Sequence, residues 1–326
     1  MQGYTYFFPI AYSATDVAIY QQDVVIHRSE GVSYEETFGD FKVWHVYVGD
    51  RCKSDYGDIR FTDASGNALA YYLWPDYDAE SARFTVRLEG ADAAGVIQIH
   101  YWNPAATTTS DGDAVYFFFD QFDGAALDTT KWDWDPKSTV TVSGGTVSVK
   151  GIFDDGTFHG IKGKQSFDTQ ACRLEIQCLA IPDKFGEIGW GDHYRTDSES
   201  NLNRIMIRAA GPGIREGVVV KGGAWTLFPW VWPVPPKQYG FARSGASALY
   251  YIDGVLSKTY TSSTYVPTVP LSPVINTNGE RGPFIIDSVV VRAHSAAPPA
   301  ATAFGPEQVP GTLHHVVFGS ANMMVV

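Results

Sequence analysis

Apolar and polar residues alternate with a period of two through most of the 326 residues. The alternation is clear in DVAIYQQDVVIHR (16–28), FKVWHVYVG (41–49), ARFTVRLEG (82–90) and GVIQIHYWN (95–103). Successive side chains of a strand point to opposite faces, so such runs predict strands with one buried face. The 32 Gly and 18 Pro supply turns between short strands. The sequence therefore predicts an all-β protein built from antiparallel β-sandwiches.

Segments rich in small and turn-forming residues divide the chain. A length of 326 residues suggests about two domains of roughly 100–200 residues each. We predict a small sandwich over residues 1–105, a connector over 106–117, a larger sandwich over 118–294, and a Pro/Ala-rich extended spacer with a C-terminal hairpin over 295–326. The terminal hairpin is apolar and short, so we expect it to dock on its own domain or on another chain.

The formal net charge of −12, without any cluster of Lys or Arg, argues against nucleic acid and anionic lipid as partners. Neutral or cationic partners, including sugars and divalent metals, remain compatible with this charge. No run of 18 apolar residues occurs, so we expect no membrane insertion. The N-terminus MQGYTYFFPIAYSATD has neither a basic region nor a continuous apolar region, and we expect no signal peptide.

Three cysteines are present, an odd number without the spacing of metal ligands. Cys172 and Cys178 are six residues apart, which is about 20 Å along one strand and too far for a disulfide. We predict that these two and Cys52 are buried thiols.

Two segments resemble one known family. CKSDYGDIRFTDASGNALAYYLWPDYD (52–78) and VIQIHYWNPAATTTSDGDAVYFFFDQFDG (96–124) are similar to domain-of-unknown-function family 2341, over about residues 4–120. That family often has a carboxylate after the aromatic pair, whereas Pro75 follows Trp74 here. The resemblance implies a β-sandwich typical of surface-exposed microbial and viral proteins, and it implies no catalytic activity. We expect the 52–78 hairpin to be architectural.

A second resemblance covers about residues 118–294. FFFDQFDGAALDTTKWDWDPKSTVTVSGGTVSVKG (117–151) and GPFIIDSVVVRAH (282–294) resemble the first and last strands of a concanavalin-A-like lectin/glucanase jelly roll. The resemblance implies a structural Ca²⁺ between those strands, with Asp120, Asp123 and Asp287 as ligands. Aspartates in such pairs with glycine are also common turn formers, and both interpretations stay open.

Enzymes built on this jelly roll cleave β-glucans with acids spaced E-x-D-x-E or E-x-x-D-x-E on one strand. The chain has no such triad, and Glu175 and Glu187 are the nearest candidates. Glu187 and Asp192 are five residues apart and would point to opposite faces of a regular strand. We therefore predict that the protein is not an enzyme.

Residues 187–232 combine aromatic rings, which can stack on sugars, with planar polar groups, which can bind their hydroxyls. The predicted ligand-binding residues are Trp190, Asp192, Tyr194, Asn203, Arg204, Trp225, Trp230 and Trp232. A single such ring more often belongs to the core of a sandwich. The prolines of WTLFPWVWPVPP (225–236) interrupt a regular ladder, however, and should push Trp230 or Trp232 onto a loop, so we predict at least one exposed ring there.

These patterns predict a non-catalytic surface or receptor-binding protein that binds glycan or host cell-surface polysaccharide. We expect an adhesin or a virion component of the tail or fibre type, on the virion surface or extracellular. It would form a homo-oligomer or assemble with other structural proteins. Two alternatives stay open: a glycoside hydrolase with an unorthodox acid pair that includes Glu187, and a purely structural assembly subunit.

Overall fold

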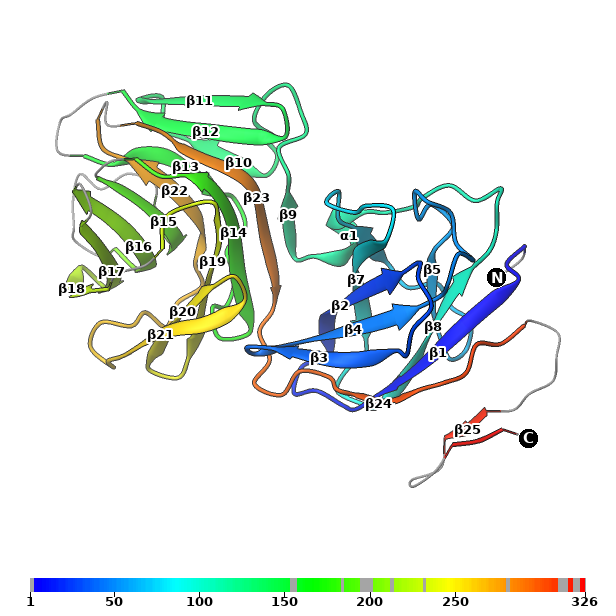
Figure 1. The fold of residues 1–326 in the computed structure, drawn as a ribbon. Coiled ribbons are helices and arrows are strands. Elements are labelled where there is room, and N and C mark those ends of the chain that lie inside the picture. The colour runs from blue at the N-terminus through cyan, green and yellow to red at the C-terminus, as the bar shows by residue number, and fades with distance from the viewer. Residues whose placement is uncertain are drawn as a thin grey trace. The chain divides into compact units, whose positions relative to one another are not determined.

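The computed structural model of the protein describes residues 3–152, 157–182, 185–193, 202–211, 214–230, 233–279 and 282–309, and the strands 316–318 and 323–325. The described chain is almost entirely strand, with one four-residue helix, α1 (Gly112–Val115). It forms two compact units: Met1–Tyr116 with Ser295–Val326, and Phe117–His294 (Figure 1). The all-β prediction is confirmed. No helix among the described residues is long and apolar enough to cross a membrane.

The first unit contains a four-stranded and a five-stranded sheet. Its strands are β1 (Tyr6–Tyr12), β2 (Ile19–His27), β3 (Tyr34–Phe38), β4 (Phe41–Tyr47), β5 (Arg60–Asp63), β6 (Tyr71–Leu73), β7 (Ser81–Glu89), β8 (Gly95–Tyr101) and β24 (Ala301–Phe304). The strand orders are β24-β1-β8-β5 and β3-β4-β2-β7-β6. Alternation buries one face of each strand, as Val24 and Ile26 on β2 and Trp44 and Val46 on β4 show.

The C-terminal segment completes the first unit. We expected an extended spacer here, but β24 pairs antiparallel with β1 and forms the edge of the four-stranded sheet. Beyond β24, the Glu307 carboxylate accepts hydrogen bonds from the Tyr101 hydroxyl and the Arg51 guanidinium. The Pro/Ala-rich composition concealed this pairing, because backbone hydrogen bonds to an edge strand leave no mark on the sequence. The strands β25 (Val316–Phe318) and β26 (Met323–Val325) pair antiparallel with one another.

The second unit is a sandwich of two larger sheets. Its strands are β9 (Phe118–Asp120), β10 (Trp132–Trp134), β11 (Ser138–Ser143), β12 (Thr146–Gly151), β13 (His159–Gly163), β14 (Cys172–Ala180), β15 (Gly186–Gly191), β16 (Arg204–Gly211), β17 (Ile214–Lys221), β18 (Ala224–Pro229), β19 (Lys237–Ser244), β20 (Ser247–Ile252), β21 (Val255–Thr261), β22 (Ser272–Thr277) and β23 (Phe284–Ala293). The seven-stranded sheet has the order β10-β13-β22-β15-β16-β17-β18. The eight-stranded path is β11-β12-β23-β14-β19-β20-β21, and β9 pairs with β23 off this path.

One apolar core fills the space between these two sheets. Trp132, Ile188 and Trp190 contribute from the seven-stranded sheet, and Ile176 and Val289 from the eight-stranded sheet. The alternate residues of the seven-stranded sheet face away from this core, and we call that side its outer face. The architecture is the jelly roll that the sequence predicts.

All three cysteines are free and buried, as predicted. Burial raises the pKa of the Cys52 and Cys172 thiols to about 12. These thiols are therefore protonated at neutral pH and poorly reactive.

We expect Glu307→Ala to destabilise the first unit by about 1–3 kcal/mol, because it leaves the buried Tyr101 hydroxyl without its acceptor. Urea unfolding monitored by fluorescence measures the change. Glu30→Ala is the matched control, since exposed Glu30 faces the same Arg51 at 3.7 Å and its loss should alter stability little. Equal losses in the two variants would contradict the role assigned to Glu307.

Candidate functional site

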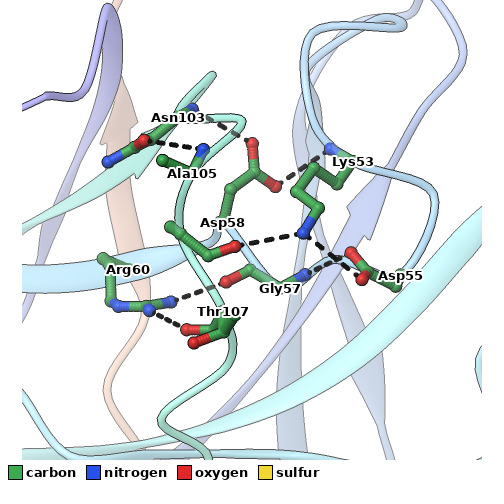
Figure 2. Close-up of polar contacts among 9 residues, drawn as sticks. Lys53, Asp55, Gly57, Asp58, Arg60, Asn103, Ala105 and Thr107 are labelled. Atoms are coloured by element: carbon green, nitrogen blue, oxygen red, sulfur yellow. Dashed lines mark hydrogen bonds and ion pairs between the residues drawn. The ribbon is translucent and has the colours of Figure 1, made fainter.

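The DYGDIRF motif and the NPAATTT segment of the first unit are joined by polar contacts (Figure 2). Asp58 is almost fully buried, and its carboxylate accepts hydrogen bonds from the backbone N–H groups of Lys53 at 2.9 Å, Trp102 at 3.0 Å and Asn103 at 3.3 Å. Trp102 has a positive φ of 66°, a backbone conformation that residues other than glycine rarely adopt. The hydrogen bonds to Asp58 help to hold it. Asp58 therefore fixes the start of the second segment against the first.

Basic side chains make further contacts between the same two segments. The Lys53 ammonium donates to the carbonyl of Ala106 at 3.0 Å, and the Arg60 guanidinium donates to the carbonyls of Thr107 and Gly57 (Figure 2). Arg60 also donates to the Tyr71 hydroxyl at 2.9 Å. These charged groups are engaged with backbone carbonyls, so the cluster is a structural joint, as expected for this hairpin. The predicted connector is bonded to the first unit through this joint.

The outer face of the seven-stranded sheet carries a different polar cluster. On β15 its only side chain is Glu187, because Gly189 and Gly191 occupy the other outer positions. Gly189 has a φ of +146°, and a Cβ there would lie 2.4 Å from the Ile205 carbonyl oxygen. The position thus requires glycine, and the side chains of Met206 and Val274 cover the backbone beside Glu187.

Glu187 forms a buried ion pair with Arg204. The Arg204 Nη1 to Glu187 Oε2 distance is 2.7 Å, and the two residues are 5% and 2% exposed. Arg204, on β16, pairs with Gly191 on β15. The side chains of Arg204 and Glu187 therefore approach each other over the Gly189–Met206 pair that lies between them. The guanidinium compensates a carboxylate that is shielded from water, which would otherwise be a costly arrangement.

A cross-strand row continues the polar cluster. Glu187 pairs with Arg208 on β16, and Arg208 pairs with Glu216 on β17. Directly paired residues share a face, so Glu187 and Glu216 flank Arg208 with their Cα atoms about 10 Å apart. The sequence analysis did not identify Glu216, because strand register is not visible in residue spacing.

The outer face is apolar toward its β17 and β18 edge. Met206, Val218 and Val220 form a buried cluster there that is separate from the main core, and Val274 on β22 joins it across the glycines of β15. Trp225 on β18 pairs with Val220 and is 49% exposed. An exposed ring therefore occurs in residues 225–236, but it is Trp225 on the regular strand β18, whereas the prolines led us to expect Trp230 or Trp232 on a loop. The face therefore joins an exposed indole, an apolar strip and a buried acid–base cluster.

The other predicted ligand-binding residues have mixed positions. Trp190 was wrongly placed in a binding groove: it is fully buried in the core, and its Nε1 donates to the Phe241 carbonyl at 2.8 Å. Trp230 is partly buried against the same core and contacts the Tyr250 ring edge-on. Core and surface tryptophans cannot be distinguished from parity alone in a segment interrupted by prolines.

Asp192 and Asn203 lie beyond the ends of β15 and β16 and bond to each other, with Asn203 Nδ2 donating to Asp192 Oδ2 at 2.9 Å. The pairing of β15 is regular from Gly186 to Gly191, so side chains alternate between the two faces along this strand. This alternation would place Asp192, the next residue, on the opposite face from Glu187. Tyr194 and Trp232 lie outside the described residues.

The three predicted calcium ligands do not form a side-chain cage. Both Asp120 oxygens accept hydrogen bonds at 2.7 Å, from the Phe122 N–H and from Trp132 Nε1, and burial raises the pKa of this carboxyl. Asp123 is exposed, and Asp287 is partly buried on β23. Among the described residues no three His, Cys, Asp or Glu side chains gather to hold a metal. A calcium site built on backbone carbonyl oxygens stays a prediction.

The fold class is a β-sandwich jelly roll joined to a smaller sandwich. Residues 55–135 match the family described as a domain of unknown function (DUF2341), which confirms the family resemblance in the sequence. No curated protein matches the chain.

Solved structures with similar folds cover little more than half of the chain. One, titled for endo-acting O-glycanases of the human gut microbiota that initiate mucin breakdown, has 18% identity, a TM-score of 0.41, and coverage of 55% of this chain and 99% of its own. A β-1,3-glucanase from Mycobacterium marinum has 13% identity, a TM-score of 0.40, and coverage of 54% and 98%. A Bacillus licheniformis β-glucanase has 15% identity, a TM-score of 0.38, and coverage of 54% and 96%.

These neighbours correct one prediction. Most of them are named as glycoside hydrolases, which contradicts our prediction that the chain is not an enzyme. At this identity and TM-score the likeness describes the fold and not the reaction.

We expect Asp58→Ala to cost about 1–3 kcal/mol of stability, because it removes a buried acceptor from three backbone N–H groups. Asp63→Ala is the control: Asp63 also accepts N–H groups, from Ser65 and Asn67, but at an exposed turn where water can replace it. Thermal unfolding of both variants checks the difference. A Tm for Asp58→Ala at or above that of Asp63→Ala would contradict the structural role.

Proposed function

We propose that the second unit is a glycoside hydrolase whose substrate lies over the outer face of the seven-stranded sheet, with Glu187 as one of two acting carboxyl groups. The observation that carries this proposal is the placement of Glu187. It is a buried carboxylate on the face opposite the main core, paired with Arg204, and it is the only side chain of β15 on that face. Buried charged groups concentrate at functional sites, since a fold alone gains little from them.

Glu216 is the second carboxyl group in this proposal. Glycosidases need two carboxyl groups on opposite sides of the scissile bond, one as acid and one as base or nucleophile. Glu216 shares the outer face with Glu187, and its Oε2 atom is shielded from solvent without a hydrogen-bond partner among the described residues. Asp192 is the less suitable partner, because strand alternation places it on the opposite side.

Trp225 supplies a surface on which a sugar ring can stack. Its indole is exposed at the β18 edge of the same face, beyond the apolar strip of Met206 and Val218. Trp225 lies in the cross-strand row of Val220 and Arg204, so a glycan that stacks on Trp225 and extends across the strands would reach Arg204, the ion-pair partner of Glu187. The predicted oligomeric assembly and the extracellular or virion-surface location stay predictions.

We expect Glu187→Gln and Glu216→Gln each to lower hydrolysis by about 10²–10⁴-fold, because each removes a group that transfers a proton or attacks the anomeric carbon. Release of reducing sugar from β-1,3-glucan, mixed-linkage β-glucan and mucin glycans measures the activity.

Glu175→Gln is the matched control for these two variants. Glu175 is buried and forms an ion pair with Arg173 at 3.2 Å on the eight-stranded sheet, away from the outer face. Its replacement should affect stability in the same way but change activity less than twofold. Full activity in Glu187→Gln would refute the proposal, as would equal losses in Glu187→Gln and Glu175→Gln.

The stereochemistry of the product tests the choice of Glu216. Carboxyl groups about 6.5–9.5 Å apart leave room for a water and invert the anomeric centre, whereas about 5–5.5 Å gives retention. Two strand spacings separate Glu187 from Glu216, so we expect inversion, with the α-anomer appearing first from a β-linked substrate in a time course of ¹H NMR spectra. Retention would assign the second role to a carboxyl group nearer to Glu187.

A further inference from the structure

Arg204 has hydrogen-bond donors that its ion pair does not use. Nη1 donates to Glu187, whereas Nε and Nη2 are shielded from solvent and have no hydrogen-bond partner among the described residues. In a planar guanidinium, Nε–H and one Nη2–H point in parallel from the same edge. That edge is the fork that binds both oxygens of a carboxylate or two oxygens of a sulfate.

Arg208 adds a third donor to the same region. Its Nε is also shielded and unpartnered among the described residues. Arg208 lies opposite Glu187, and Glu187 contacts the Arg204 guanidinium. The Arg208 guanidinium carbon lies 5.6 Å from the centroid of the Phe158 ring, and the Cα atoms of the two arginines are about 13 Å apart along β16. Glu187 thus adjoins both arginines, one through its cross-strand pairing and the other through the ion pair.

Unpaired buried donors of a charged group are costly and rare in folded proteins, so they call for a ligand or another compensating group. The Figure 2 cluster shows the usual outcome, because the guanidinium of Arg60 donates to carbonyl and hydroxyl oxygens. Arg204 is only 5% exposed, yet one edge of its guanidinium has no hydrogen-bond partner among the described residues.

The charge of the chain does not oppose an anionic ligand at this place. The second unit has 17 Lys and Arg against 18 Asp and Glu, a net charge of −1. The first unit, including Ser295–Val326, has 7 against 18, a net charge of −11. The net charge of −12, from which the sequence predicts that polyanions do not bind, belongs almost wholly to the first unit. Exposed charges are also screened beyond about 8–10 Å at physiological salt.

We propose that the glycan bound at this face carries an anionic group, either the carboxylate of a uronic acid or a sulfate ester, which binds the Nε–Nη2 edge of Arg204 with Arg208 Nε as an additional donor. This inference rests on the proposed function and specifies its substrate class. The anion replaces the missing acceptors, and the Glu187 carboxylate stays on Nη1.

Affinity electrophoresis of the full chain tests the proposal with two matched polymer pairs. Polygalacturonate and its carboxyl-reduced form test the carboxylate, and dextran sulfate and dextran test the sulfate. We expect one charged polymer to bind at least tenfold more tightly than its neutral counterpart. Arg204→Lys keeps the charge but loses the fork, so it should weaken binding of the charged polymer about tenfold more than binding of its neutral counterpart.

Two further variants separate recognition from folding. Arg208→Lys should weaken binding of the same charged polymer. Because this variant keeps the Glu187–Arg204 pair intact, it tests the proposal even if Arg204→Lys fails to fold. Arg243→Lys is the control, because Arg243 is buried in the same unit with Nε, Nη1 and Nη2 all hydrogen-bonded, and it should not change the preference for charge.

Equal binding of charged and neutral polymers would overturn the inference, as would a parallel loss of both in Arg204→Lys. If hydrolysis of a neutral glucan still depends on Glu187 in that case, the hydrolase proposal stands without anion recognition. Failure of all four polymers to bind would overturn the inference as well.

Discussion

Burial of both faces of the seven-stranded sheet is the constraint on which the second unit depends. One face packs on the shared core through residues such as Ile188 and Trp190. The other buries Met206 and Val274 in a separate cluster, so a charge on that face has little access to water. Glu187 and Arg204 can occupy it only as a pair. The site thus follows from sheet packing.

The sequence predicted the fold well, because strand alternation is a local property. Segments such as 82–90 and 95–103 became β7 and β8, and the all-β jelly roll with its free, buried cysteines was predictable from composition and motifs. The site depends on register, which is not local. Glu187, Arg208 and Glu216 form one row only because β15, β16 and β17 pair as they do, and no spacing along the chain encodes that row. Trp190 was misplaced because alternation shows which residues share a face but not which face packs on the core.

The first unit shows how a discontinuous segment can escape sequence analysis. Residues 295–309 have the composition of a spacer, yet β24 closes the edge of a sheet and Glu307 accepts a hydrogen bond from the buried Tyr101 hydroxyl. The second unit is therefore an insertion between two parts of the first. This arrangement also separates the charges, because most of the net negative charge belongs to the unit that lacks the candidate site. A whole-chain charge is a poor guide when two units differ this much.

The comparison of three arginines distinguishes architecture from function in this protein. Arg60 donates to carbonyl and hydroxyl oxygens between two loops, and Arg243 uses all three of its nitrogens on Thr169, Gly245 and Asp168. Both are explained fully by the fold. Arg204 uses one nitrogen and leaves a complete fork edge shielded and unused among the described residues. A fold gains nothing from withholding acceptors from a buried guanidinium. This unused edge is the observation from which we propose that Arg204 binds an anionic group of the ligand.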